Sequence, residues 1–418
     1  MSLLIKRVTL NDKLTDVFVD DGIIARIGEN LKQKAKTVID GSGKAIIPSF
    51  HNAHTHAAMS LMRGYADDLK LREWLTRHIW PFESRLTEED VYNGTRLACL
   101  EMIKSGTTFF NDMYWHHRGT IRAVEEMGLR AAVSAVMIDN FDPDKATQQK
   151  TVNERLFEES AGYSERIQFS LGPHAIYTVS EESLRWCAQF AAVNNLRIHI
   201  HLSETETEVA DCLKKHGMRP VEYLHHIGFL GANVTAAHVI HVTEKEIDIL
   251  AKTRVSIAHC PTSNMKLCSG KFPYSAIAKK GIAIAIGTDG CASNNNLDMS
   301  EEMKIAALSE KFAQGDPSAL GASEAFIHTT STPAEIFGLN SGKIDEGKSA
   351  DFILLDLNNV RLLPGHNLIS DIVYSADSSC IDTTVCAGKI LMLNRRVESE
   401  QEIVNAARET CNHIVATK

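Results

Sequence analysis

The chain has 418 residues, of which 44% are hydrophobic and 23% charged, the composition of an ordinary globular protein. This length exceeds one small domain and predicts a large core with a second module. The formal net charge of −9 argues against nucleic acid or an anionic membrane surface as the main partner. No stretch approaches ~20 uninterrupted apolar residues, so we expect no membrane span.

The nine cysteines are scattered and include no Cys-x-x-Cys pair. Such spacing makes a poor disulfide framework and a poor thiolate metal site, and it favours a reducing compartment. The first 22 residues carry charges inside every short apolar run, unlike a secretory signal. We therefore expect a cytoplasmic protein.

Short strands fill the two ends of the chain. Asp-Asp-Gly at 20–22 stands between alternating apolar runs, and Ala-Gly-Lys at 387–389 separates two more, so each triplet predicts a tight hairpin. The economical arrangement pairs the two ends, residues 1–48 and 342–418, into one composite β-sandwich domain. We expect an amphipathic helix over 398–418 to close the chain.

Residues 49–341 alternate between strand and helix patterns. The eight strand candidates are residues 45–56, 107–114, 130–138, 167–176, 196–202, 234–241, 254–259 and 282–289. Helices are expected between them, and two more over 299–314 and 322–337. Such alternation implies parallel strands, and eight units predict a (β/α)8 barrel of the TIM type as the catalytic domain. A doubly wound open sheet is the alternative, but no early strand is followed by a Gly-x-Gly-x-x-Gly turn.

Ionisable side chains gather where the strand candidates end, the face of a barrel that carries chemistry. In the stretch His54-Thr55-His56 the two imidazoles share one face of a strand, and neutral imidazole is the commonest protein ligand for zinc. Barrel closure places the first and eighth strands side by side, so Asp289 can reach the same ion. His201 can add a third imidazole. The pattern predicts a metal site of three histidines and one aspartate.

The fifth strand candidate offers two histidines on one face. His201 lies near the rim with Glu204 just beyond it, so we assign His201 to the metal and His199 to a buried structural role. A bound metal with an open position lowers the pKa of water to ~7. Asp289 and Glu204 are the candidate acids and bases; a carboxylate beside a helix N-terminus is the alternative role for Glu204.

Seven motifs occur in order over nearly the whole chain: PSFHNAHTH, WLTRHIWPFE, LGPHAIY, HIHLSET, AAHVIH, AHCPTSNMKL and GTDGCASNN. With ADFILLDL and AGKILM near the C-terminus, the chain resembles the amidohydrolase superfamily. It is most similar to the branch of 5′-methylthioadenosine/S-adenosylhomocysteine deaminases and triazine hydrolases. The combined signal is specific, whereas no single motif is.

The resemblance implies a mononuclear zinc site, with Fe²⁺ or Mn²⁺ as alternatives, whose ligands are His54, His56, His201 and Asp289. It also implies that Glu204 protonates the purine ring nitrogen and that His238 orients the attacking water. Asp289 would pass the proton of that water to the departing amine. The reaction would convert an adenosine-like nucleoside (5′-methylthioadenosine, S-adenosylhomocysteine or adenosine) to its inosine analogue and ammonia.

The resemblance also implies that the substrate is contacted by Trp74, Glu83, His174 and Ser293. Glu83 would accept the ribose hydroxyls. Arg155 is the nearest candidate by position for the carboxylate of a homocysteine tail. The chain departs from the usual family pattern at Ser49, His51 and Cys260.

Two other interpretations stay open. One is hydrolysis of another aminated or chlorinated heterocycle, such as guanine, a pterin or a triazine, which Glu83 as a ribose contact argues against. The other is a metal-free structural or assembly protein, which the intact ligand set argues against. We expect a small-molecule nucleoside as partner rather than nucleic acid or a membrane. The 5′ substituent and a homo-oligomeric state (dimer or tetramer) stay open.

Overall fold

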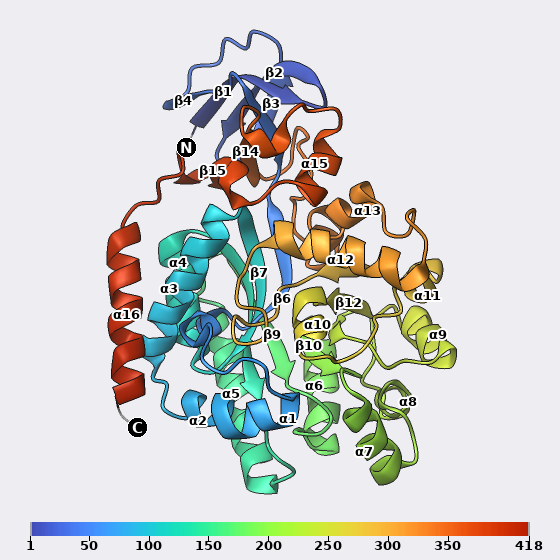
Figure 1. Cartoon of the computed structure of the whole chain (residues 1–418). Coiled ribbons are helices and arrows are strands. Elements are labelled where there is room, and N and C mark those ends of the chain that lie inside the picture. The colour runs from blue at the N-terminus through green and yellow to red at the C-terminus, as the bar shows by residue number, and fades with distance from the viewer. Residues whose placement is uncertain (1, 417–418) are drawn as a thin grey trace.

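The computed structural model describes residues 2–416 and contains two sheets (Figure 1). The larger body is a barrel of eight parallel strands, whose neighbours follow one another in chain order. The strands are β6 (Phe50–Thr55), β7 (Thr107–Tyr114), β8 (Arg130–Met137), β9 (Ile167–Pro173), β10 (Arg197–Leu202), β11 (Val234–His238), β12 (Ser256–His259) and β13 (Ile284–Ile286). The N–H of Asp289, just after β13, donates to the carbonyl of His54 on β6 at 2.9 Å. The expected barrel is confirmed.

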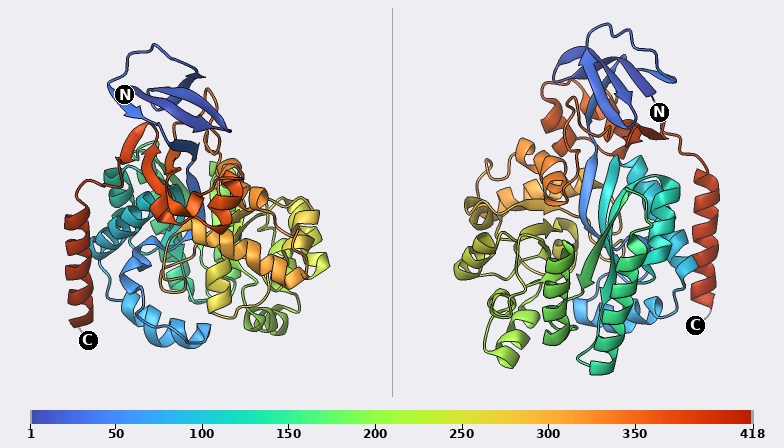
Figure 2. Two further views of the ribbon diagram at one scale, coloured as in Figure 1. Left: turned by 45° about the horizontal axis from the view of Figure 1, so that its top comes forward. Right: turned by 180° about the vertical axis from the view of Figure 1, so that it is seen from behind.

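The second sheet joins the two ends of the chain and stands at one end of the barrel (Figures 1 and 2). Its order is β16-β15-β14-β5-β1-β2-β3, with β4 paired to β1. The strands are β1 (Ser2–Leu10), β2 (Lys13–Asp20), β3 (Ile23–Gly28), β4 (Thr37–Asp40), β5 (Lys44–Pro48), β14 (Phe352–Asp356), β15 (Ile381–Cys386) and β16 (Lys389–Met392). The antiparallel pair β5–β14 joins the N-terminal and C-terminal strands, and residues of both ends share one buried cluster.

Both expected hairpins form with the left-handed backbone that a tight two-residue turn requires. Asp21 and Gly22 have φ of 45° and 78°, and Ala387 and Gly388 have φ of 49° and 72°. The two turns touch, since a Cβ on Gly388 would lie 2.9 Å from the Cα of Gly22. Each end of the chain thus contributes one turn to the same corner of the sheet.

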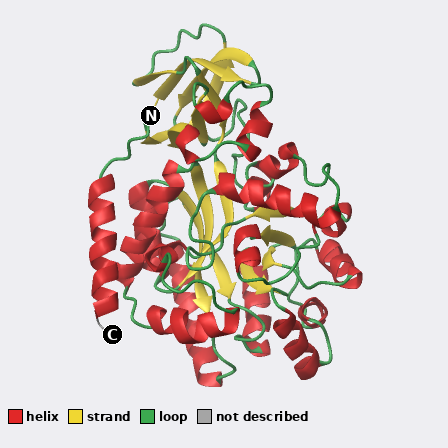
Figure 3. Ribbon diagram, in the orientation of Figure 1, coloured by secondary structure: helices red, strands yellow, loops and turns green. Residues whose placement is uncertain are grey.

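Helices surround the barrel (Figure 3). They are α3 (Glu88–Lys104), α4 (His117–Met127), α5 (Pro143–Ser160), α6 (Glu181–Asn194), α7 (Glu206–His216), α8 (Pro220–His226), α9 (Glu244–Thr253), α10 (Pro261–Lys266), α11 (Tyr274–Lys279), α12 (Met299–Gln314), α13 (Ala322–Ile327), α14 (Ser331–Ile336), α15 (Leu368–Tyr374) and α16 (Glu400–Ala416). A further segment runs from α1 (Leu71–Trp74) through a π-helical turn (Leu75–Ile79) to α2 (Trp80–Glu83). Within residues 2–416 no helix is long and apolar enough to cross a membrane.

Three expected elements differ from the structure. The strand over 45–56 is divided into β5 and β6, which belong to different sheets, at Pro48, a residue without an amide N–H for a ladder. The helix over 322–337 is divided into α13 and α14, and Pro333 lies in the first turn of α14, where no intrahelical N–H is needed. The closing helix is α16, which packs along α3 (Figures 1 and 2); its last two expected positions lie outside the described residues.

Candidate metal centre and active site

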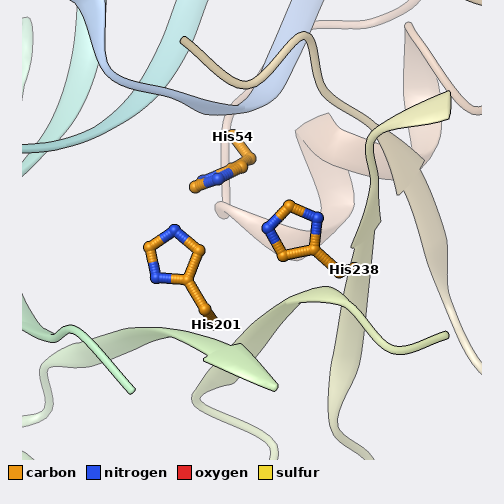
Figure 4. A group of neighbouring side chains, drawn as sticks. All are labelled: His54, His201 and His238. Carbon is orange, nitrogen blue, oxygen red and sulfur yellow. The ribbon is translucent and has the colours of Figure 1, made fainter. Parts of the chain in front are cut away.

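The four expected metal ligands meet at the C-terminal end of the barrel strands. The Nε2 atoms of His54 and His56 lie 3.4 Å and 3.3 Å from Oδ1 of Asp289. The Nε2 atoms of His56 and His201 lie 3.3 Å apart. Figure 4 shows the rings of His54, His201 and His238 around one common space.

Backbone carbonyls determine which ring nitrogens face this space. Nδ1 of His56 lies 2.7 Å from the carbonyl oxygen of Met113, and Nδ1 of His201 lies 2.8 Å from that of His174. Since a carbonyl only accepts hydrogen bonds, each Nδ1 carries the proton and each Nε2 carries a lone pair. Both lone pairs are therefore available to one metal ion.

The donor set fits a metal ion. The Nε2 atom of His54 is buried and has no hydrogen-bond partner, a costly state for a polar atom unless a ligand satisfies it. The Nε2 atoms of His56 and His201 face each other with lone pairs, which repel unless a cation lies between them. Three imidazoles and one carboxylate are a donor set that zinc accepts.

Asp289 is held at the junction of β13 and β6. Its backbone has φ of 63°, its Oδ2 accepts the hydroxyl of Ser263 at 2.6 Å and its Oδ1 accepts the N–H of Gly290 at 2.8 Å. Gly287 permits the close approach of the two strands, because a Cβ there would lie 2.6 Å from the backbone nitrogen of His54. Burial raises the pKa of Asp289, but the close approach of His54 and the other nearby imidazoles outweighs it and lowers this pKa below its usual range.

Glu204 and His238 face each other beside the ligands, with Oε2 and Nε2 separated by 3.9 Å. Nδ1 of His238 donates to Oδ1 of Asn264 at 2.9 Å, which leaves its Nε2 lone pair toward the site. Glu208 accepts the backbone N–H groups of Ser203 and Glu204, each at 2.8 Å, and so fixes the loop that carries Glu204. Burial raises the pKa of Glu204, as a general acid near neutral pH requires.

A cavity of about 620 Å³, its open mouth included, adjoins this cluster. Trp74, Glu83 and His174 line it as expected. The indole N–H of Trp115 donates to Oε2 of Glu83 at 3.3 Å, and burial raises the pKa of Glu83.

Two expected substrate contacts are not brought to the cavity wall. Ser293 is buried behind Asp289, where its Oγ lies 2.9 Å from Oγ of Ser263. Arg155 lies on α5 with a side chain 60% exposed, 3.6 Å from Glu159 one helical turn away. Arg155 therefore lies on an outer helix and does not line the cavity. Its position along the chain could not reveal this.

The three departures from the family pattern leave the ligands untouched. Ser49 and His51, near the start of β6, pair with Thr108 (Oγ to Oγ1, 2.6 Å) and with Ser341 (Nε2 to Oγ, 2.9 Å). Cys260 is buried at the N-terminus of α10. All three act in packing below or beside the site.

Comparison with known proteins agrees with this arrangement. A profile of the Amidohydrolase family matches residues 45–391. The chain is 47% identical over 388 residues to the 5-methylthioadenosine/S-adenosylhomocysteine deaminase 1 of Archaeoglobus fulgidus, covering 92% of each chain. It is 42% identical to the 5'-deoxyadenosine deaminase of Methanoregula boonei, covering 99% of this chain and 95% of that one.

The structure resembles that of an adenosine deaminase from Xanthomonas campestris with bound zinc, with a TM-score of 0.92 and 32% sequence identity. The match covers 99% of this chain and 98% of the other.

Proposed function

Because the chain belongs to the amidohydrolase family, we propose that it is a zinc-dependent hydrolytic deaminase of an adenosine-like nucleoside. The products are the inosine analogue and ammonia. The observation that carries the proposal is the buried set of three imidazoles and one carboxylate facing Glu204 and His238. The relatives named as deaminases of adenosine-type nucleosides support the substrate class.

His54, His56, His201 and Asp289 would hold one ion per subunit. When bound, such an ion lowers the pKa of a coordinated water to ~7 and supplies a nucleophile at neutral pH. We favour zinc because the donor set suits it and because the Xanthomonas enzyme contains it. Fe²⁺ or Mn²⁺ would suit the same donors.

The proton transfers fall to three side chains. Glu204, whose pKa burial raises, donates to the purine ring nitrogen next to C6. The Nε2 lone pair of His238 accepts a hydrogen bond from the attacking water and so orients it. Asp289 takes one proton from this water. The water oxygen bonds to C6, the C6–N bond breaks, and the proton on Asp289 goes to the amine, which leaves as ammonia. The remaining proton of the added hydroxyl returns to Glu204, which leaves the C6 carbonyl of the inosine analogue.

The remaining wall would hold the nucleoside. Glu83 is the acceptor for the ribose hydroxyls, Trp74 is an aromatic face for stacking, and His174 adjoins the ligands. The substrate is a small molecule, and we propose no role for Ser293 or Arg155 in contacting it. The nine unpaired cysteines support our placing of the enzyme in a reducing cytoplasm.

The test combines metal analysis with an ammonia assay on adenosine, 5′-methylthioadenosine, 5′-deoxyadenosine and guanine. We expect one zinc ion per subunit and ammonia from the nucleosides but not from guanine. Ammonia from guanine alone would assign the chain to another heterocycle. Absence of metal, together with no ammonia release after zinc reconstitution, would disprove the proposal.

A further inference from the structure

Among residues 2–416, no permanently charged basic side chain, lysine or arginine, lines the cavity. The wall contains three carboxylic acids (Glu83, Glu204 and Asp289) and four histidines. Much of the remaining wall is aliphatic and comes from three places, the segment from α1 to the π-helical turn, the end of β8 and the loop after α10. The aliphatic side chains include Leu71, Leu75, Ile79, Val136, Ile138 and Leu267.

Two basic residues close in sequence to this wall have acidic partners outside it, and Lys70 and Arg72, which flank Leu71, are exposed and do not line the cavity. Lys266, which precedes the wall residue Leu267, contacts Oδ1 of Asp67 at 2.5 Å. Arg77 donates to Oε1 of Glu73 at 2.8 Å with a side chain 73% exposed. Neither side chain is part of the cavity.

β8 is the barrel strand that makes this apolar wall. Val136 and Ile138 are two residues apart at its end, so both side chains point to the same face. β8 lies between β7 and β9 in the barrel and carries none of the metal ligands or catalytic acids proposed above. Its contribution to the cavity is purely aliphatic.

In adenosine, C6 and the 5′ carbon lie at opposite ends of the molecule. When C6 faces the metal ligands, the 5′ substituent therefore meets another part of the wall. A carboxylate on the wall would lose water contacts without a lysine or arginine to pair with, which is unfavourable. A methyl or methylthio group would instead exchange water for aliphatic contacts.

Building on the function proposed above, we infer that the cavity selects nucleosides with an uncharged, apolar 5′ substituent and discriminates against a 5′ substituent that carries a carboxylate. 5′-Deoxyadenosine and 5′-methylthioadenosine belong to the favoured class. S-Adenosylhomocysteine, with its amino acid tail, belongs to the disfavoured class.

The test compares kcat/KM for 5′-methylthioadenosine, S-adenosylhomocysteine and 5′-butylthioadenosine, an uncharged thioether whose chain approaches the homocysteine tail in length. We expect the two uncharged thioethers to agree within about tenfold and S-adenosylhomocysteine to be at least about 100-fold poorer, a difference of about 2.8 kcal/mol. S-Adenosylhomocysteine within tenfold of 5′-methylthioadenosine would overturn the inference. A butylthio compound as poor as S-adenosylhomocysteine would overturn it too, because length would then be the cause. If no nucleoside releases ammonia, the proposed function itself fails.

A variant pair tests the role of charge. The backbone of Ile138 is fixed by Gln149, whose Oε1 accepts its N–H at 2.8 Å and whose Nε2 donates to its carbonyl at 2.7 Å, so its side chain can be exchanged. Ile138→Arg is expected to raise the ratio of S-adenosylhomocysteine to butylthio turnover at least tenfold, and Ile138→Gln is expected not to. An equal effect of both variants, or no effect of Arg, contradicts the inference. Arg155→Ala, on the outer helix, should leave the ratio unchanged; a fall would show that a cation does serve the tail.

Discussion

The Nε2 atom of His199 on β10 lies 2.7 Å from the Nδ1 atom of His54 on β6. A residue of the fifth barrel strand thus contacts an expected metal ligand on the first barrel strand. The two rings are stacked, with centroids 4.7 Å apart and planes 23° apart. The side-chain amide of Asn111 contacts the other ring nitrogen of His199. The contact holds the ring of His54 in place, so His199 is a positioning residue.

His199→Phe is therefore expected to weaken zinc affinity about 10–100-fold, the usual effect of losing a partner behind a ligand. His199→Gln, which retains a hydrogen-bonding group for His54, is expected to restore most of this affinity. Competition with a chromogenic chelator measures both. If the two variants bind zinc equally well or equally poorly, His199 serves in packing alone.

Removal of the metal should destabilise the fold as well as stop turnover. A ligand that binds only the folded state adds stability according to its concentration relative to Kd, and three strands or their ends (β6, β10 and β13) supply the expected ligands. We expect a strong chelator to lower the midpoint of thermal unfolding by about 5 °C. Zn²⁺ should reverse the shift, and Mg²⁺ should not, because Mg²⁺ prefers oxygen ligands. Unchanged melting after measured loss of the metal would contradict this coupling.

Glu204→Gln keeps the shape of the side chain but removes the acid. We expect kcat to fall about 10²–10⁴-fold, the usual share of general acid–base catalysis, while bound zinc stays unchanged. Glu206→Gln is the matched control, because Glu206 is exposed in the first turn of α7; it should leave kcat unaltered. Steady-state ammonia release and metal analysis measure both variants. A Glu204→Gln enzyme with full kcat would move the acid role to another group.

Sequence periodicity was sufficient to predict the barrel and to bring the expected ligands to one place. The eight strand patterns placed His54, His201 and Asp289 at one rim, because closure of a (β/α)8 barrel leaves no other arrangement. Periodicity also placed His199 on the face of His201, yet it could not show that His199 contacts His54, since that contact joins β10 to β6 across the barrel.

The substrate wall was harder to predict. Glu83 and Trp74 line the cavity as the motif WLTRHIWPFE implied. No sequence pattern identified Val136 and Ile138 as cavity residues, because an aliphatic residue at the end of a strand can either line a cavity or pack in a core. Arg155 was chosen by its position along the chain, and α5 turns it outward to Glu159.

His51 makes the stability of the protein depend on pH. Its ring is 1% exposed, and burial lowers the pKa of His51 to about 4 from 6.5. The unfolded chain takes up this proton below pH 6.5 while the folded chain does so only near pH 4, so stability is full above pH 6.5 and falls as the pH decreases between these values. At pH 5 the loss from this one group is about 2 kcal/mol.

His51→Gln retains a side chain that can reach Ser341, whose hydroxyl lies 2.9 Å from Nε2 of His51, but it does not titrate. The variant should therefore lose about 2 kcal/mol less unfolding free energy than the parent when the pH falls from 7.5 to 5. The other buried histidines occur in both proteins, so their contributions cancel in the difference. Urea unfolding at the two pH values measures it. If both proteins lost the same unfolding free energy, His51 would be protonated in the folded protein at pH 5. Its burial would then not control acid stability.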